Sequence, residues 1–161
     1  MCFNAIILKK YAKENQSMNI LVSACLLGVN CRYNAVRKED KMALKLMEKY
    51  TVIPFCPEVY GGLPTPRIPG ERVGNNVIGK DGSDLTQYYI EGGKEAVRLA
   101  LMYGCKFAVL KERSPSCGHG KIYDGSFTGR LVEGDGITAE LLERAGIKVY
   151  GESDIPDLLE D

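Results

Sequence analysis

Cysteines are the residues of this chain whose number and spacing call for a chemical explanation. Six are present, and a single histidine, His119, leaves little room for a site built on histidine pairs. Three of them, Cys25, Cys56 and Cys117, follow short apolar runs typical of strands. Because ligands of open parallel sheets bind outside the carboxyl ends of the strands, we expect these three thiols to share one site.

Soft thiolate ligands select zinc, cuprous copper or an iron–sulfur cluster. The close Cys-x-x-Cys pairs of structural zinc sites are absent, so three widely spaced cysteines favour a cubane cluster with one iron lacking a protein ligand. Such an iron acts as a Lewis acid. Cys31 lies six residues after Cys25 and is either a fourth ligand or packs under the site, and Cys105 is expected in the core.

Polar side chains near these cysteines are of the kinds that move protons or bind a carbonyl edge. Glu58 follows Cys56 in a Cys-Pro-Glu sequence, and Arg67 lies in a long loop where its guanidinium suits an anionic or carbonyl group. The alternative for each charged residue is a solvated loop face. The complete set of candidates is Ser23, Glu58, Arg67, Ser114 and Ser116.

The elements that position these residues follow from alternating patterns. Short apolar runs predict four strands, at residues 19–24, 51–55, 106–110 and 147–150. Helical periodicity predicts helices at residues 38–49, 85–103 and 137–145, with a closing turn at 156–160. This alternation predicts an α/β fold, a three-layer Rossmann-like sandwich with a short parallel sheet of about four strands, helices on both faces and long site-forming loops.

Two stretches, residues 56–83 and 112–136, are rich in glycine, proline and serine and are predicted to be irregular. Loops of this length are usually functional. Residues 1–17, which include Cys2, lack a clear period and are expected to be an extension without a chemical role. Residues 18–161 are predicted to form a single domain.

Composition narrows the classes of function. The 161 residues carry 21 basic and 21 acidic side chains, so the formal net charge is zero and there is no strong signal for nucleic-acid binding. No apolar run approaches the roughly 20 residues of a membrane span, and the first lysines follow the apolar patch, the reverse of a secretory signal. A cytoplasmic protein with reduced thiols is therefore expected.

Three segments resemble the thiouracil desulfidase family, a family of small bacterial proteins long catalogued as a domain of unknown function. They are SACLLG at residues 23–28, CPEVYGGLPTPR at 56–67 and KERSPSCG at 111–118. The carboxyl part, GITAELL at 136–142 and Gly146-Ile, is similar to the same family. The resemblance runs from about Met18 to the end of the chain.

This resemblance implies a [4Fe-4S] cluster held by Cys25, Cys56 and Cys117. It implies that the thiocarbonyl sulfur of a thiolated nucleobase is replaced by oxygen without net redox change. By the same resemblance, Glu58 is the candidate base that activates water, and Ser114 is the candidate for positioning substrate or water. The family pattern does not require a cysteine at Cys31, and a fourth ligand there would make the cluster structural or electron-carrying.

The partners expected from the resemblance are a small thiolated base or nucleoside, such as 2-thiouracil, and the machinery that assembles clusters. Ser23, Arg67 and Ser116 are the expected substrate-binding residues. Related domains fused to a second domain act on thiolated tRNA, but the balanced charge of this chain favours a free base or nucleoside.

Two rival hypotheses remain. The first is a binding module that a metal or cluster stabilises and that has no catalytic activity. The second is a thiol redox protein that uses Cys25 and Cys31, although a spacing of six differs from the usual Cys-x-x-Cys pair.

Overall fold

The centre of the molecule is a four-stranded parallel sheet. A computed structural model describes residues 17–160, and its sheet has the order β2-β1-β5-β8. The strands are β1 (Asn19–Ser23), β2 (Thr51–Phe55), β5 (Phe107–Leu110) and β8 (Lys148–Gly151). The predicted fold class is confirmed, and each strand lies within one or two residues of its predicted position.

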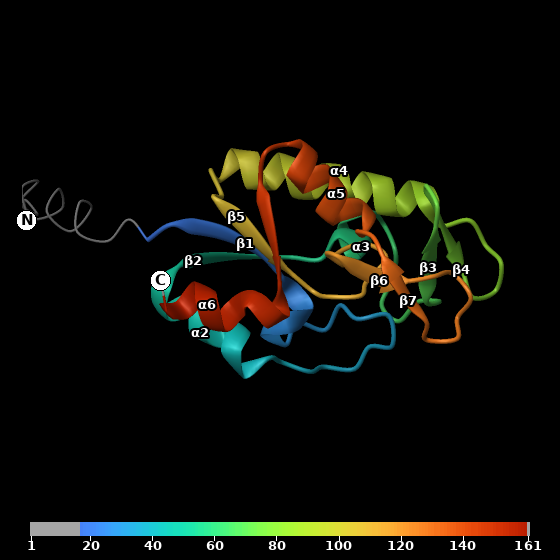
Figure 1. Cartoon of the computed structure of the whole chain (residues 1–161), viewed down its shortest axis with the longest axis horizontal. Coiled ribbons are helices and arrows are strands. Elements are labelled where there is room, and N and C mark those ends of the chain that lie inside the picture. The colour runs from blue at the N-terminus through green and yellow to red at the C-terminus, as the bar shows by residue number, and fades with distance from the viewer. Residues whose placement is uncertain (1–16, 161) are drawn as a thin grey trace, which may run out of the picture.

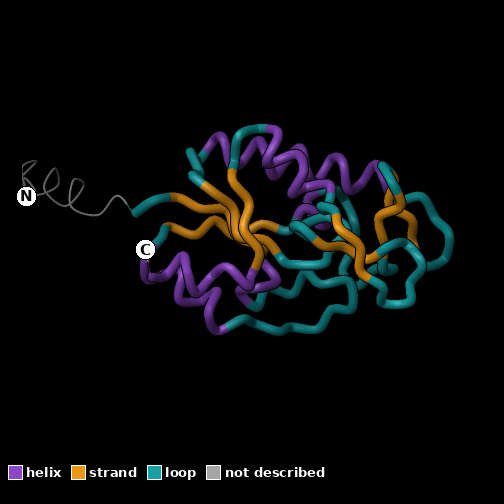
Figure 2. The backbone as a smooth tube through the Cα atoms, viewed as in Figure 1, coloured by secondary structure: helices purple, strands orange, loops and turns teal. Residues whose placement is uncertain are grey.

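Helices cover both faces of this sheet (Figure 1, Figure 2). One face packs against α2 (Lys41–Lys49) and α6 (Ile155–Glu160), and the other against α4 (Thr86–Met102) and α5 (Ile137–Arg144). Each face of the sheet packs in its own hydrophobic core. Successive side chains of β1 point into opposite cores: Ile20 packs in the core on the α2–α6 side and Leu21 in the core on the α4–α5 side. None of these helices combines the length and apolar character that a membrane span requires.

Capping residues set the helix ends. Asp40 accepts hydrogen bonds from the backbone N–H groups of Met42 and Ala43, so α2 begins at residue 41 rather than at the predicted 38. At α4 the N-cap position is Leu85, which has no side-chain cap; the Asp84 carboxylate just before it accepts from Thr86 N at 2.9 Å, and the helix begins at Thr86, one residue later than predicted. Gly104 follows α4 with a φ of 59°, the left-handed conformation that glycine commonly adopts just past a helix end.

A glycine pair in the middle of α4 lets two neighbouring elements approach closely. A Cβ on Gly92 would lie 1.9 Å from the carbonyl oxygen of Pro57, and one on Gly93 would lie 2.7 Å from Cδ1 of Leu141. The short helix α3 (Pro57–Tyr60) therefore packs directly against the backbone of α4 at Gly92, and α5 packs against it at Gly93. This close approach positions Glu58, which α3 carries.

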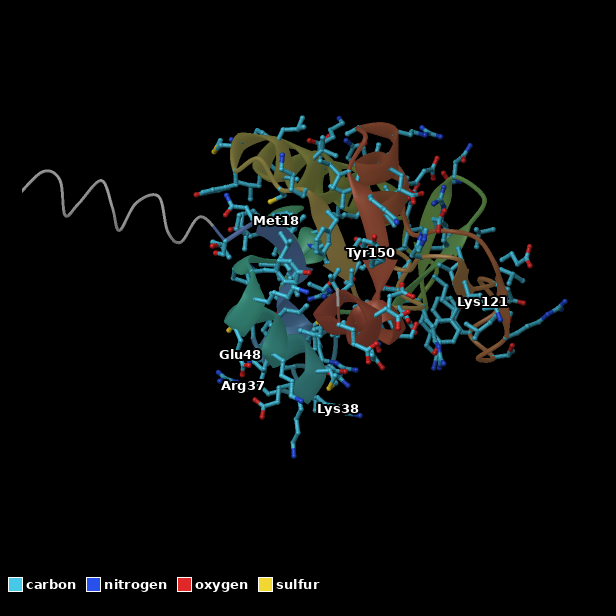
Figure 3. The ribbon with its side chains drawn as sticks, turned by 60° about the vertical axis from the view of Figure 1, so that its left-hand side comes forward. Met18, Arg37, Lys38, Glu48, Lys121 and Tyr150 are labelled. Carbon is cyan, nitrogen blue, oxygen red and sulfur yellow. The ribbon has the colours of Figure 1, made fainter. Side chains whose placement is uncertain are left out.

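The two stretches predicted to be irregular contain two small antiparallel hairpins as well as α3, so that prediction was wrong in part. The hairpins are β3 (Gly70–Val73) with β4 (Asn76–Gly79), and β6 (Lys121–Tyr123) with β7 (Leu131–Glu133). Strands of three or four residues are too short to give a detectable period. Both hairpins lie beyond the carboxyl ends of the parallel strands (Figure 1), and Figure 3 shows Lys121 on the opposite side of the molecule from Met18.

Candidate active site

Three cysteines meet at the carboxyl edge of the sheet. Cys25 lies in the 3₁₀ turn η1 (Ala24–Leu27) directly after β1, and Cys56 directly follows β2. Cys117 lies seven residues beyond the end of β5, the other neighbour of β1. The three side chains line one cavity of about 610 Å³. The strand order β2-β1-β5 thus brings together thiols that are far apart in the sequence.

Cys31 is a fourth thiol at the same cavity. Cys56 Sγ donates to the backbone carbonyl of Cys31 at 3.8 Å, and the Cys31 thiol lies where it can donate to the thiolates of Cys25 and Cys56. This contact is the main cause that lowers the pKa of both, and the pKa of Cys56 falls to about 7. The positive charge of Arg32 also lowers the pKa of Cys25, whereas the same sulfur contacts raise the pKa of Cys31. The pKa of Cys31 is thus raised, while the pKa values of its neighbours Cys25 and Cys56 are lowered.

A serine-rich turn presents Cys117. The Ser114 hydroxyl oxygen accepts hydrogen bonds from the backbone N–H groups of Ser116 and Cys117, each at 3.1 Å. Both bonds use Oγ as an acceptor, so the Ser114 hydroxyl proton remains available for donation. Burial raises the pKa of Cys117, and a hydrogen bond from the Ser23 hydroxyl opposes this effect. Ser23 Oγ also accepts from Lys111 N at 2.9 Å.

Glu58 is fixed by a nearly buried ion pair. Arg67 Nε donates to Glu58 Oε2 at 2.7 Å, and the two side chains are 5% and 15% exposed. Arg67 Nη2 donates to the carbonyl of Cys31 at 2.8 Å, and Nη1 donates to that of Pro64 at 3.2 Å. The Tyr89 hydroxyl donates to the same Oε2 at 3.4 Å, and burial raises the pKa of this phenol.

The predicted polar residues divide into two groups. Ser23, Glu58, Arg67 and Ser114 line the cavity beside the cysteines. Ser116 is fully buried instead, and its hydroxyl pairs with Thr138 Oγ1 at 2.8 Å at the start of α5. Ser116 therefore holds the cysteine-bearing turn against α5 and is not part of the cavity wall.

Sequence reasoning missed several residues of the cavity wall. Tyr89 gave no signal, because its position on the α4 helix fits an ordinary core residue. Glu71, Tyr123 and Phe127 come from the two hairpins that the sequence did not predict, or from the loop between β6 and β7. The only available signal was an aromatic ring within the turn sequence Gly-Ser-Phe-Thr-Gly at residues 125–129.

The donor set of this cavity fits a soft metal centre. Sulfur is the ligand type that zinc, cuprous copper and iron–sulfur clusters accept. Cys25, Cys56 and Cys117 come from the ends of three different strands and not from paired zinc knuckles. This arrangement fits a cluster held by three thiolates, with Cys31 as a neighbouring thiol.

Residues 20–154 match the model of a protein family described as 2-thiouracil desulfurase. This match spans most of the chain. The chain belongs to the 2-thiouracil desulfurase family. The resemblance stated from the three cysteine-containing segments is thereby confirmed.

Individual relatives agree with this membership. YbbK of Bacillus subtilis (strain 168), an uncharacterized protein, is 38% identical over 150 residues, which cover 87% of this chain and 99% of YbbK. A solved structure of TudS, a [4Fe-4S]-dependent thiouracil desulfidase, is 45% identical, with a TM-score of 0.81. The structural match covers 88% of this chain and 95% of that chain.

Proposed function

We propose that this chain is a [4Fe-4S]-dependent desulfidase, which replaces the thiocarbonyl sulfur of a thiolated nucleobase such as 2-thiouracil with oxygen. One water and one thiocarbonyl give a carbonyl and hydrogen sulfide, so the reaction needs no electron donor. The observation that carries this proposal is the convergence of Cys25, Cys56 and Cys117 beside Glu58 in one cavity. Similarity to TudS supports the same reaction.

Cys25, Cys56 and Cys117 would hold the cluster. When bound, a cluster with three protein ligands supplies a Lewis-acidic iron for the thiocarbonyl sulfur. We assign Cys31 to a position beside the cluster and not to the fourth ligand position, because the proposed reaction needs one iron without a protein ligand.

Glu58 is the base in this proposal. Arg67 and Tyr89 both contact its Oε2 atom, whereas Oε1 takes no hydrogen bond from any residue between 17 and 160. Oε1 is thus the oxygen that accepts a proton from the attacking water, while Oε2 fixes the carboxylate. The free hydroxyl proton of Ser114 suits donation to a polar atom of the substrate or to the water.

The substrate-binding roles expected of Ser23 and Arg67 remain predictions. Both residues line the cavity, but Ser23 contacts Cys117, and Arg67 already pairs with Glu58. For Ser116 we assign a structural role, because its fully buried hydroxyl forms a hydrogen bond with Thr138.

We further infer that residues 18–161 act as one domain in the cytoplasm, where cluster-assembly machinery supplies iron and sulfide. The five described cysteines are free thiols, which supports a reducing environment. The expected substrate is a free thiolated base or nucleoside.

The experiment that tests this function is anaerobic reconstitution followed by turnover. About four irons and four acid-labile sulfides per chain are expected, with conversion of 2-thiouracil to uracil and sulfide. C117S should lose iron, whereas the matched control C105S should keep it, because Cys105 lies in the α4–α5 core. E58Q should keep its iron and lose turnover. Zinc without sulfide in the reconstituted protein would overturn the proposal, and full turnover by E58Q would remove Glu58 as the base.

A further inference from the structure

Glu71 is a buried carboxylate whose partners do not include a cation. It lies on β3, is 8% exposed, and forms no ion pair with any lysine or arginine in residues 17–160. Its Oε2 atom accepts hydrogen bonds from the backbone N–H groups of Gly125 at 2.9 Å and Phe127 at 3.0 Å. Burying a carboxylate without a cation costs free energy, so its two hydrogen bonds to the loop must offset that cost. The conformation of this loop is therefore the feature that Glu71 maintains.

The loop held by Glu71 connects β6 to β7 and has an unusual backbone. Phe127 has a φ of 57°, the left-handed region that side chains other than glycine rarely adopt. Inside the loop, Asp124 Oδ1 accepts from Ser126 N at 2.9 Å, and Asp124 N donates to the carbonyl of Arg130 at 3.1 Å. The hydrogen bonds from Glu71 and those within the loop thus together maintain the left-handed conformation of Phe127, which costs free energy by itself.

The result of this arrangement is the placement of an aromatic ring in the cavity. Phe127 is half-buried and belongs to no core cluster of the described residues, but it lines the same cavity as Cys25 and Glu58. The hairpins that carry Glu71 and Phe127 lie side by side beyond the sheet edge (Figure 1). The cavity therefore has thiols and the Glu58 carboxylate from the sheet side, and Glu71, Tyr123 and the phenyl ring of Phe127 from the hairpin side.

We propose that Phe127 is the stacking surface for the planar base of the substrate and that Glu71 is the positioning residue that presets this ring. The identity of the base rests on the proposed function. A phenyl ring offers a flat apolar face to any heteroaromatic base, and stacking of this kind tolerates different bases. Stacking against Phe127 orients the plane of the base relative to Glu58, and Glu71 acts in this proposal through its hydrogen bonds to the backbone N–H groups of Gly125 and Phe127.

A tryptophan reporter tests the stacking directly, because the chain contains no tryptophan. In F127W, the fluorescence should be quenched in a saturable manner by 2-thiouracil and by uracil. The matched reporter Y103W should not respond, since Tyr103 is exposed at the far end of α4 and does not line the cavity. An F127W signal that is insensitive to both bases, in protein that still turns over 2-thiouracil, would overturn the proposal.

Kinetics of the reconstituted enzyme test the same assignment independently. F127A should raise KM by roughly 5- to 150-fold, the loss expected for one stacked base, with kcat changed far less. F127Y should restore most of the affinity. An unchanged KM in F127A would refute the stacking role. If the wild-type protein does not turn over 2-thiouracil but F127W still binds a base, the proposed function fails and the stacking surface stands.

The role of Glu71 is tested by non-additivity. E71A should raise KM in the same direction as F127A, and the double variant should be no worse than F127A alone, because both changes remove one interaction. E71Q should recover affinity, since its amide oxygen still accepts from the two N–H groups. Urea unfolding of each variant monitors folding. Effects of E71A and F127A on KM that multiply in the double variant would contradict the positioning role.

Discussion

Replacement of Arg67 by methionine should destabilise the protein and displace Glu58. Methionine keeps the apolar stem of the side chain but removes a guanidinium that donates to Glu58 and to the carbonyls of Cys31 and Pro64. Both members of the ion pair are largely buried, so R67M leaves the Glu58 carboxylate buried without its cation. Breaking a buried pair in this way costs about 3–5 kcal/mol. For a chain of this length, that loss lowers Tm by roughly 6–20 °C.

A double-mutant cycle with E58Q isolates the cause of this loss. If the stranded charge dominates, R67M should cost roughly 2 kcal/mol less in the E58Q background than in the wild type, a coupling within the usual range for contacting residues. The assay is equilibrium urea unfolding of the four proteins, both iron-free in reductant and reconstituted under anaerobic conditions. Equal costs of R67M in both backgrounds would refute the reasoning.

Kinetics of R67M separate positioning from substrate binding. A displaced Glu58 should lower kcat by about two orders of magnitude with little change in KM, because a small misplacement of a catalytic group has effects of this size. A higher KM with an unchanged kcat would show instead that Arg67 contacts the substrate, as the sequence predicted.

Two further predictions concern Ser116 and Cys31. S116A should lower the free energy of unfolding by about 1–3 kcal/mol, because Thr138 loses its buried hydrogen-bond partner. KM should not change in this variant. A raised KM would place Ser116 in substrate binding. In the iron-free protein, alkylation of Cys56 followed by mass spectrometry should rise with pH around its pKa of about 7, because only the thiolate reacts. C31A removes the hydrogen bond that lowers this pKa, so the midpoint should move to higher pH, and an unmoved midpoint would contradict the assigned contact.

The sequence alone determined the central sheet and the location of the thiols. Residues 51–55 were predicted as a strand with the bounds that the structure has, because a short apolar run between polar segments is a local signal. Once the strands are parallel, Cys25 and Cys56 must lie at the same edge, so their convergence follows from topology without knowledge of side-chain contacts.

Only the tertiary structure decided how the other residues of the cavity act. Glu58 and Tyr89 are 31 positions apart, and Glu71 and Phe127 are 56 apart, so no local pattern links either pair. Tyr89 has the helical spacing of a core residue, and its hydroxyl reaches Glu58 in a fold where Gly92 admits α3 against α4. Periodicity records which face of an element is apolar, whereas the partner of a buried polar group depends on how the elements pack.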